Sequence, residues 1–398
     1  MPWVFGQKVM ANNQQRILYV CQGAYPWEVR VEKFCDTLVA AGYHVTVLCR
    51  WNGEINEHEV VGGANIVRVG YRRPTWQSLP TSANPLWASA VRQAVRDCEP
   101  NLIIVREMLL ASACVAAARG KCSVVMDMAE HYPAAMKSWK KYRRGVVGPL
   151  LVHTLNVPEY IEKRTASAVD GIITVCSENL ERVHDSFGTP HAQMTVVHNT
   201  PWLHSFDGIR IGCSDPPRVF SYQGWITRER GVERLVSAFA KSGAAKRDSE
   251  LLIAGGGESL EDVRREVLIS GVADRIRIMG EFSSDQLKDV LSDTDVGVIP
   301  FDQDEFRNHT IPNKLFDYMA SGKPVIVSNC SPLARIVNET SCGIVVDIQN
   351  PEQLVSALHD VQDGNVKQMS ENGRKAAETR YNWEQDAHHL LTFITSYL

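Results

Sequence analysis

Short runs of apolar, often β-branched residues recur along this chain, with segments of helical length between them. Because strands that are apolar on both faces and alternate with helices form parallel sheets covered on both sides, the pattern predicts an α/β protein. In the first half the predicted strands are Arg16–Cys21, His44–Arg50, Asn65–Val69, Leu102–Arg106, Val124–Met128, Gly171–Val175 and Thr195–His198. In the second half they are Val219–Gln223, Leu251–Ala254, Ile276–Met279, Val296–Pro300, Val325–Ser328 and Ile344–Asp347.

Two such sets of strands predict two doubly wound parallel-sheet domains, with ligands at the carboxyl ends of the strands. The length of 398 residues also fits two domains. A stretch rich in proline and glycine, residues 199–217, is the expected connection. We place the domains at residues 1–205 and 206–382, and expect a last helix over about 383–398 to pack back onto the first domain.

Composition narrows the possible functions. The formal net charge is -4, whereas a chain whose whole surface binds nucleic acid is usually basic, so we expect no nucleic-acid partner. The ten cysteines form no C-x-x-C pair, which disfavours structural zinc and redox dithiols and fits a reducing compartment. The longest uncharged stretches, Met108–Ala118 and Gly145–Val157, are shorter than a bilayer span, and no signal peptide is evident. We therefore expect a cytoplasmic protein.

The segment DVGVIPFDQDEFRNHTIPNKLFDYMASGKPVIVSN, residues 295–329, carries the most informative chemistry. A strand ends at Pro300, and Pro312 marks the first turn of a helix. Asn313 and Lys314 then lie at the helix N-terminus, where free N–H groups favour a phosphate. Asp317 lies one turn further on the same side, where it can accept hydrogen bonds from ribose hydroxyls. The alternative is an ordinary helix with a surface lysine.

This segment resembles the donor-binding region of retaining glycosyltransferases of the GT-B fold, family 4. The pieces FSYQGWITRERGVERLVSAF, LLIAGGGE and RIRIMGEFSSDQLKDVLSDTDVGVIPF are similar to the same domain of that family, in the same order. The resemblance implies two Rossmann-like domains that face each other across a cleft. Residues 1–205 would bind the acceptor, and residues 206–382 would bind the nucleotide-sugar donor.

The family usually carries two glutamates separated by seven residues, the first touching the donor sugar and the second the ribose. Counting back from Gly322, the matching positions here are His309 and Asp317. Asp317 keeps a carboxylate on a shorter arm, and His309 can still hydrogen-bond a sugar hydroxyl. Glu305 is a second candidate for the role of the first glutamate.

Two basic side chains of the family bind the diphosphate after the first strand of the donor domain. In GWITRERG the lysine-like position is Arg230, while Trp225 replaces the usual arginine and Arg228 is its candidate substitute. Arginine suits phosphate oxygens and stabilises a leaving nucleoside diphosphate without a metal. The alternative is a solvated basic loop.

Glycine turns are weaker evidence for nucleotide binding than the charged residues. The turn at residues 255–257 with Glu258 implies nucleoside contacts, especially from Gly256 and Glu258, although a turn of this kind alone fits a dinucleotide site equally well. The family often has paired glycines after the first strand of the chain, where only Gly23 is present. A diphosphate contact from Gly23 remains one interpretation.

Candidate acceptor-side residues follow strands of the first domain. VVMDMAEHYP places Asp127, Glu130 and His131 at the end of one strand, as candidates to orient or deprotonate the acceptor hydroxyl. Arg106 and Glu107 end another strand and are candidate acceptor contacts. A helix N-cap or a buried polar contact is the alternative for each.

A basic run with interleaved aromatic residues follows. MKSWKKYRRG contains Lys137, Lys140, Lys141, Arg143 and Arg144, and the apolar GVVGPLLVHTL comes next. Basic residues beside interfacial aromatics suit an anionic membrane surface. A solvated helix face is the alternative.

Together these features predict a glycosyltransferase that moves a sugar from a UDP- or GDP-linked donor to the hydroxyl of a lipid-linked or saccharide acceptor, with retention at the anomeric carbon. No metal or other cofactor is expected, because basic side chains take the place of the ion. The expected setting is assembly of a surface polysaccharide or glycolipid, at the inner face of the plasma membrane. A nucleotide-sugar epimerase or hydrolase on the same fold, and a non-catalytic nucleotide-sugar-binding protein, are the alternatives.

Overall fold

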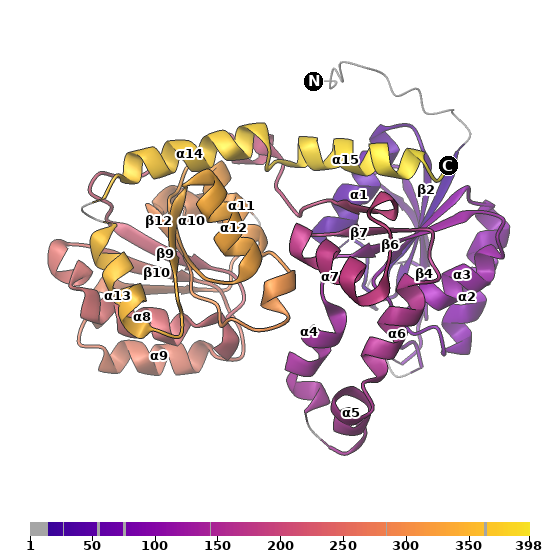
Figure 1. The fold of residues 1–398 in the computed structure, drawn as a ribbon, viewed down its shortest axis with the longest axis horizontal. Helices are drawn as coiled ribbons and strands as arrows, with labels where there is room; N and C mark the ends of the chain where they lie inside the picture. Colours follow the sequence, from indigo (N-terminus) through magenta and orange to yellow (C-terminus); the bar gives the residue numbers. More distant parts are fainter. Residues whose placement is uncertain are drawn as a thin grey trace. The chain divides into compact units, whose positions relative to one another are not determined.

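The computed structural model describes residues 15–398 except 27, 54–55, 75–76, 144, 284 and 362–363. The chain divides into two compact units (Figure 1). Unit 1 comprises residues up to Val197 together with Ala387–Leu398, and unit 2 comprises His198–Asp386. The sequence placed the corresponding boundaries at 205/206 and 382/383.

Unit 1 is built on an eight-stranded sheet of order β3-β4-β2-β1-β5-β6-β7-β8. Its strands are β1 Arg16–Val20, β2 His44–Arg50, β3 His58–Val61, β4 Ala64–Val69, β5 Leu102–Arg106, β6 Ser123–Met128, β7 Gly171–Thr174 and β8 Met194–Val196. All neighbouring pairs are parallel except β3, which pairs antiparallel with β4 at the edge. The sequence did not predict β3, because its four residues HEVV are half-exposed and carry no continuous apolar run.

The helices of unit 1 cover this sheet and extend beyond it. They are α1 Val29–Ala40, α2 Pro85–Cys98, α3 Ala111–Ala118, α4 Tyr132–Ser138, α5 Val147–Pro149, α6 Val157–Ala166 and α7 Ser177–Phe187, with short turns η1 Lys140–Tyr142, η2 Leu150–Thr154 and η3 His191–Gln193. In Figure 1, α4 and α6 lie side by side and lead away from the sheet, with α5 at their far end.

Unit 2 is built on a six-stranded parallel sheet of order β11-β10-β9-β12-β13-β14. Its strands are β9 Val219–Gln223, β10 Glu250–Ala254, β11 Ile276–Gly280, β12 Val296–Ile299, β13 Val325–Ser328 and β14 Gly343–Val346. Its helices are α8 Val232–Ser242, α9 Leu260–Ile269, α10 Leu287–Asp293, α11 Asn313–Ala320, α12 Ser331–Thr340, α13 Pro351–Asp360 and α14 Val366–Thr379, with short turns η4 Leu203–Phe206, η5 Arg228–Arg230, η6 Ala244–Arg247, η7 Ala273–Arg275 and η8 Arg307–His309. Helices α8, α9 and α13 pack together, as do α11 and α14.

The last helix, α15 Trp383–Thr395, begins at the residue that the sequence predicted and passes from unit 2 into unit 1. Near its end the side chains of Phe393 and Tyr397 lie against Gly171 of β7, so closely that a Cβ there would be 2.6 Å from the Tyr397 hydroxyl. Within the described part of the chain, no helix is long and apolar enough to cross a membrane.

All ten cysteines are free thiols, and most of them are buried among apolar neighbours. Burial raises the pKa of Cys98 and Cys342 to about 11 and that of Cys49 to about 12. These thiols therefore act as small apolar side chains, as their places in apolar runs predicted.

Candidate functional site

The chemistry-bearing side chains of unit 2 gather where the central strands β9 and β12 end. Strand β9 ends at Gln223 and is followed by Gly224, which has a left-handed φ of 110°. Strand β12 ends before Phe301, and helix α11 begins at Asn313. The carboxyl ends of parallel strands and a helix N-terminus meet at this edge, which is where α/β sheets bind ligands and phosphates.

Lys314 occupies the centre of this edge. Its side chain is held between two rings, with Nζ 3.8 Å from the centroid of Tyr222 and 5.1 Å from that of Phe301. The residue is only 7% exposed, and Nζ has no hydrogen-bond partner among the residues that the structure describes. A Cβ at residue 224 would lie 3.2 Å from Nζ, so glycine there leaves room for the ammonium group.

The charge state of Lys314 follows from this environment. Burial is the main cause that lowers the pKa of its ammonium well below the usual value, and the nearby Arg230 lowers the pKa further, while Asp317 partly offsets both. A buried cation without a hydrogen bond is costly, and an anionic ligand would remove that cost. Lys314 is therefore suited to a phosphate group.

Two arginines add positive charge around the same aromatic ring. The guanidinium of Arg230 lies 4.5 Å from the centroid of Phe301, and that of Arg307 lies 6.0 Å from it. Arg307 is buried and ion-paired with Asp304. Arg228 is exposed on the short helix η5. The sequence identified Arg230 and Arg228 but missed Arg307, because its polar surroundings DQDEFRNH resemble an ordinary surface loop.

Asp317 and Asn313 lie on α11, in the positions that the sequence predicted for ribose and phosphate contacts. Gln223 donates a hydrogen bond from Nε2 to Oδ2 of Asp317, at 3.4 Å. Asn199 donates from Nδ2 to Oδ1 of Asn313, at 2.8 Å. This hydrogen bond couples the Asp317 carboxylate to the end of β9, although no motif in the sequence pointed to Gln223.

His309 ends the short helix η8 in the loop before α11. Its Nδ1 lies 2.9 Å from the backbone oxygen of Glu305 and 3.5 Å from the carboxylate of the same residue. Since a backbone oxygen can only accept, Nδ1 carries the proton, and in the neutral ring Nε2 is then the acceptor nitrogen. His309 thus has the tautomer that could accept a hydrogen bond from a sugar hydroxyl.

An Asp-x-Asp sequence also follows β12, at Asp302 and Asp304. Each carboxylate is ion-paired: Asp302 with Arg234 at 2.6 Å, and Asp304 with Arg307. The two aspartates therefore serve to hold arginines beside the site.

The glycine turn after β10 is required by close packing of backbones. A Cβ at Gly255 would lie 1.9 Å from the oxygen of Gly224, and one at Gly257 would lie 2.2 Å from the oxygen of Ile226. At Gly256 a Cβ would collide with the side chain of Glu281. These contacts explain all three glycines without a ligand, so they do not by themselves place Gly256 or Glu258 on a nucleoside.

The carboxyl edge of the unit 1 sheet holds a buried ion network around Asp127. This residue is fully buried, and its carboxylate accepts hydrogen bonds from Arg30 at 2.7 Å and from Tyr19 at 2.9 Å, with Arg106 at 3.4 Å. Burial alone would raise the pKa of Asp127, but Arg30 and Arg106 outweigh burial and lower it. The geometry corrects the expectation of a catalytic Asp127, because a saturated, inaccessible carboxylate cannot reach an acceptor hydroxyl.

Arg106 is equally occupied, since it also binds Glu28 at 2.7 Å and Glu107 at 3.0 Å. Glu107 is different. Its Oε1 accepts a hydrogen bond from the backbone N–H of Ala129 at 3.1 Å, but its buried Oε2 has no hydrogen-bond partner among the described residues. Burial is the main cause that raises the pKa of Glu107 well above the usual value, and the nearby Arg106 partly offsets it. Glu107 also has a left-handed φ of 59°, a strained conformation often found at functional sites.

The remaining candidate residues of unit 1 are Glu130, His131 and Gly23. Glu130 and His131 follow β6, and His131 is the N-cap residue of α4, without a capping hydrogen bond from its side chain. The backbone oxygen of Gly23 accepts a hydrogen bond from Arg50 at 2.8 Å, and Gly23 does not have a left-handed φ. Arg144 lies outside the described residues.

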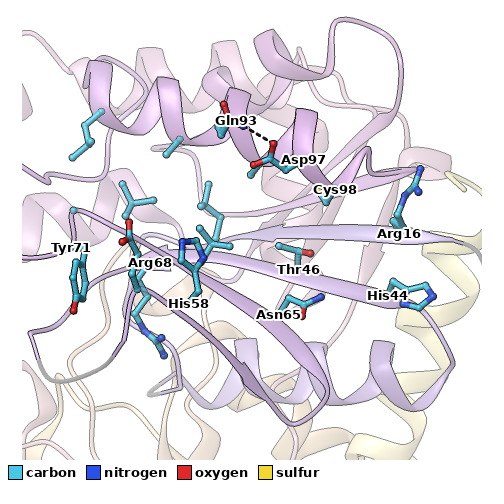
Figure 2. A pocket seen from close by; sticks show the side chains of 18 of the residues that line it. Arg16, His44, Thr46, His58, Asn65, Arg68, Tyr71, Gln93, Asp97 and Cys98 are labelled. Atoms are coloured by element: carbon cyan, nitrogen blue, oxygen red, sulfur yellow. Dashed lines mark hydrogen bonds between the residues drawn. The ribbon is translucent and has the colours of Figure 1, made fainter.

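A large groove of about 1500 Å³ follows the face of the unit 1 sheet (Figure 2). It is lined by strands β1, β2 and β4 and by helix α2, with Thr46 and Asn65 on neighbouring strands. Two of its charged residues are ion-paired, Arg16 with Glu99 and Arg68 with Glu59. The groove extends from the starts of the strands along the sheet and is not centred on their carboxyl ends, so we do not assign it to the reaction.

Two family profiles match this chain and together cover most of it. The profile of "Glycosyltransferase Family 4" matches residues 28–200, and that of "Glycosyl transferases group 1" matches residues 217–363. The chain belongs to the group 1, family 4 glycosyltransferases. Residues 217–363 include Arg230, Lys314 and Asp317, so the site of unit 2 lies within the part that carries the family signal.

Curated relatives are distant. An uncharacterized glycosyltransferase of Methanocaldococcus jannaschii is 28% identical over 54% of this chain and 57% of its own length. A GDP-mannose-dependent phosphatidylinositol monomannoside mannosyltransferase of Corynebacterium glutamicum is 22% identical over 59% of this chain and 64% of its own length. The chain thus spans little more than half the length of the curated relatives it matches.

Solved structures share the whole fold. Sucrose-phosphate synthase from Thermosynechococcus elongatus superposes with a TM-score of 0.75 at 18% identity, over 96% of this chain and 98% of the other. HepE of Anabaena in complex with UDP gives a TM-score of 0.71 at 13% identity, over 96% and 100%. With the two parallel-sheet units, these matches establish the GT-B fold.

Proposed function

We propose that this glycosyltransferase moves a sugar from a UDP- or GDP-linked donor to an acceptor hydroxyl, with retention at the anomeric carbon. The main support for this proposal is Lys314, because its buried Nζ has no hydrogen-bond partner among the described residues and an anionic ligand would supply one. HepE binds UDP, and the corynebacterial relative is GDP-mannose-dependent, so both bases are represented among similar proteins.

The proposed roles follow from the geometry of unit 2. Lys314 and Arg230 bind the diphosphate and stabilise the negative charge that develops as it leaves. Asp317, oriented by Gln223, accepts hydrogen bonds from the ribose hydroxyls. His309 accepts one from a donor-sugar hydroxyl through Nε2. We propose that no divalent metal is needed, because these cations supply the charge that a metal would otherwise provide.

The acceptor side belongs to unit 1. Glu107 remains a candidate there, since its Oε2 has no hydrogen-bond partner among the described residues. Glu130 and His131 remain candidates to orient or deprotonate that hydroxyl. A lipid-linked or saccharide acceptor, in assembly of a surface polysaccharide or glycolipid, completes the proposal.

A thermal-shift screen of the purified protein against UDP, GDP, ADP, CMP and NAD tests the donor half. A ligand at 100 times its dissociation constant stabilises the fold by about 2.7 kcal/mol. We expect UDP or GDP to raise the melting temperature. A shift with NAD alone would overturn the proposal.

The responding nucleotide sugars are then incubated with and without candidate acceptors, and the product linkage is determined by NMR. Transfer with the anomeric configuration of the donor is the expected result. Rapid donor turnover without any acceptor would favour an epimerase or hydrolase. Donor binding without any turnover would favour a non-catalytic protein.

A further inference from the structure

The helical arm of unit 1, residues 132–164, has a surface that the donor and acceptor roles do not explain. It leaves the sheet along α4 and returns along α6, with the short helices η1, α5 and η2 between them (Figure 1). The arm has a defined internal structure, because Lys137 of α4 is ion-paired with Glu159 of α6 and Val152 of η2 is buried. Its surface features are therefore held in place.

The far end of the arm exposes large aliphatic side chains. Val146 is 80% exposed, Val147 68% and Leu155 59%, and Leu150 and Leu151 are also exposed. We call these five residues the apolar tip. Five exposed large aliphatic side chains within ten residues are unusual on a soluble protein and favour a contact with a partner or a membrane.

The arm that carries the apolar tip is rich in positive charge. Over residues 132–164 the sequence has seven lysines and arginines and only two glutamates, in a chain of net charge -4. Lys140, Lys141 and Arg143 are exposed, next to the tip. Of the two glutamates, Glu159 is paired with Lys137 and Glu162 with Arg182, so neither is an unpaired negative charge on the arm.

Two aromatic residues near the cations, Trp139 and Tyr142, are partly buried against the core of unit 1. Trp139 stacks on Tyr142 with ring centroids 6.0 Å apart, and Lys141 lies over both rings, 4.5 Å and 4.9 Å from their centroids. Tryptophan and tyrosine beside lysine are typical of the headgroup level of a bilayer. A merely solvated basic helix face would not expose the five aliphatic side chains.

We propose that the arm docks on an anionic lipid bilayer, with the apolar tip inserted among the headgroups and acyl chains and the basic residues against the anionic headgroups. We propose a bilayer, and not a second copy of the chain, as the partner of the arm, because a second copy would bring two clusters of cations together. The inference rests on the proposed function in one respect: a docked arm would give unit 1 access to a lipid-linked acceptor.

Sedimentation of the purified full chain with vesicles tests the proposal. We expect binding to vesicles that contain phosphatidylglycerol and weak binding to phosphatidylcholine alone. The double variant Val146→Asp, Val147→Asp should no longer insert into the bilayer. The double variant Lys140→Glu, Lys141→Glu should weaken vesicle binding by at least about 20-fold, because loss of each positive charge alone lowers the affinity about fivefold.

Matched controls lie in unit 2. Leu268 and Ile269 are as exposed as the tip valines, and Lys241 and Lys246 are exposed lysines. The double variants Leu268→Asp, Ile269→Asp and Lys241→Glu, Lys246→Glu should bind vesicles like the wild type. Because all these side chains are exposed, the variants should keep the melting temperature of the wild type within about 2 °C.

Several results would overturn the proposal: no binding of the wild type to either vesicle, equal binding to both, or equal losses in the arm variants and their controls. Light scattering that shows a dimer dissociated by Val146→Asp, Val147→Asp, without vesicle binding, would assign the tip to a second copy. The thermal shift with UDP or GDP does not depend on the arm, so its outcome distinguishes failure of the docking surface from failure of the proposed function.

Discussion

Replacing Lys314 by methionine should stabilise the free protein and weaken its binding of nucleotide. Methionine is unbranched and similar in length, so it can fill the space between Tyr222 and Phe301 while it removes the buried ammonium. Most substitutions of buried residues destabilise a fold. Higher stability together with weaker nucleotide binding would therefore indicate that the Lys314 ammonium serves to bind the ligand.

The magnitudes follow from the unpartnered state of Nζ. A buried polar group without a hydrogen bond costs about 1–3 kcal/mol, which the substitution removes. For units of this size that gain corresponds to an increase of about 2–12 °C in melting temperature. Loss of a charged hydrogen bond to phosphate costs about 1.5–3 kcal/mol, so the dissociation constant for UDP or GDP should rise about 10- to 150-fold.

Differential scanning calorimetry of the free protein and titration calorimetry with the nucleotide measure the two effects. Lys323→Met is the matched control, because Lys323 is also a buried lysine but donates hydrogen bonds to the backbone oxygens of Arg210 and Gly212. That variant should be destabilised, with little change in nucleotide affinity. A Lys314→Met protein that is less stable than the wild type and binds nucleotide equally well would refute the reasoning.

The lowered pKa of Lys314 adds a pH dependence to the same prediction. Between this lowered pKa and the unfolded-state value of about 10.4, the unfolded chain holds more protons, so the free energy of unfolding contributed by Lys314 rises with pH across that window. A bound diphosphate favours the ammonium, and nucleotide binding should therefore take up protons at mildly alkaline pH. Titrations in buffers of different ionisation enthalpy measure this uptake, which Lys314→Met should abolish.

Four further predictions follow from the contacts described. Asp127→Asn should lower the free energy of unfolding by about 3–5 kcal/mol in urea titrations, because Arg30 loses its buried counter-ion, and stability equal to the wild type would contradict the ion network. Arg230→Ala should raise the dissociation constant for UDP or GDP by at least about 10-fold in titration calorimetry, whereas the exposed Arg228→Ala should change it by less than about fivefold. Glu107→Gln should lower the rate of transfer in an acceptor assay and leave nucleotide affinity unchanged; weaker nucleotide binding would place Glu107 on the donor side. Transfer should continue in EDTA, and loss of activity that magnesium or manganese restores would show that a metal is required.

The strands of both sheets could be predicted because each buried parallel strand is a continuous apolar run between helices. Strand β3 could not, since an antiparallel edge strand with exposed side chains has no such run. Lys314 and Asp317 could be placed on one helix face by spacing alone. That Lys314 would lie between two rings depends on β9 and β12, which are distant in sequence and adjacent in the sheet.

Most of the residues missed or misjudged share a cause. Spacing indicates that Asp127 follows a strand, but it carries no information on the arginines that converge on it from α1 and β5. Arg307 was missed because its polar surroundings resemble an ordinary surface loop. The glycines at 255–257 were identified correctly as a turn, yet a Cβ there would collide with Gly224 and Ile226, which follow β9, and with Glu281, which follows β11. Long-range contacts decide the cases of Asp127 and the glycines, whereas the partners of Arg307, Asp304 and Phe301, are close to it in the sequence.

The raised pKa values of the buried cysteines affect how this protein could be labelled. With thiol pKa values of about 11 for Cys98 and Cys342, only about one molecule in 10⁴ carries the reactive thiolate there at neutral pH. A cysteine introduced at an exposed position, with an ordinary pKa near 8.5, would be thiolate about 300 times more often. A fluorophore should therefore react with Val146→Cys faster than with Cys98 or Cys342 in the native protein.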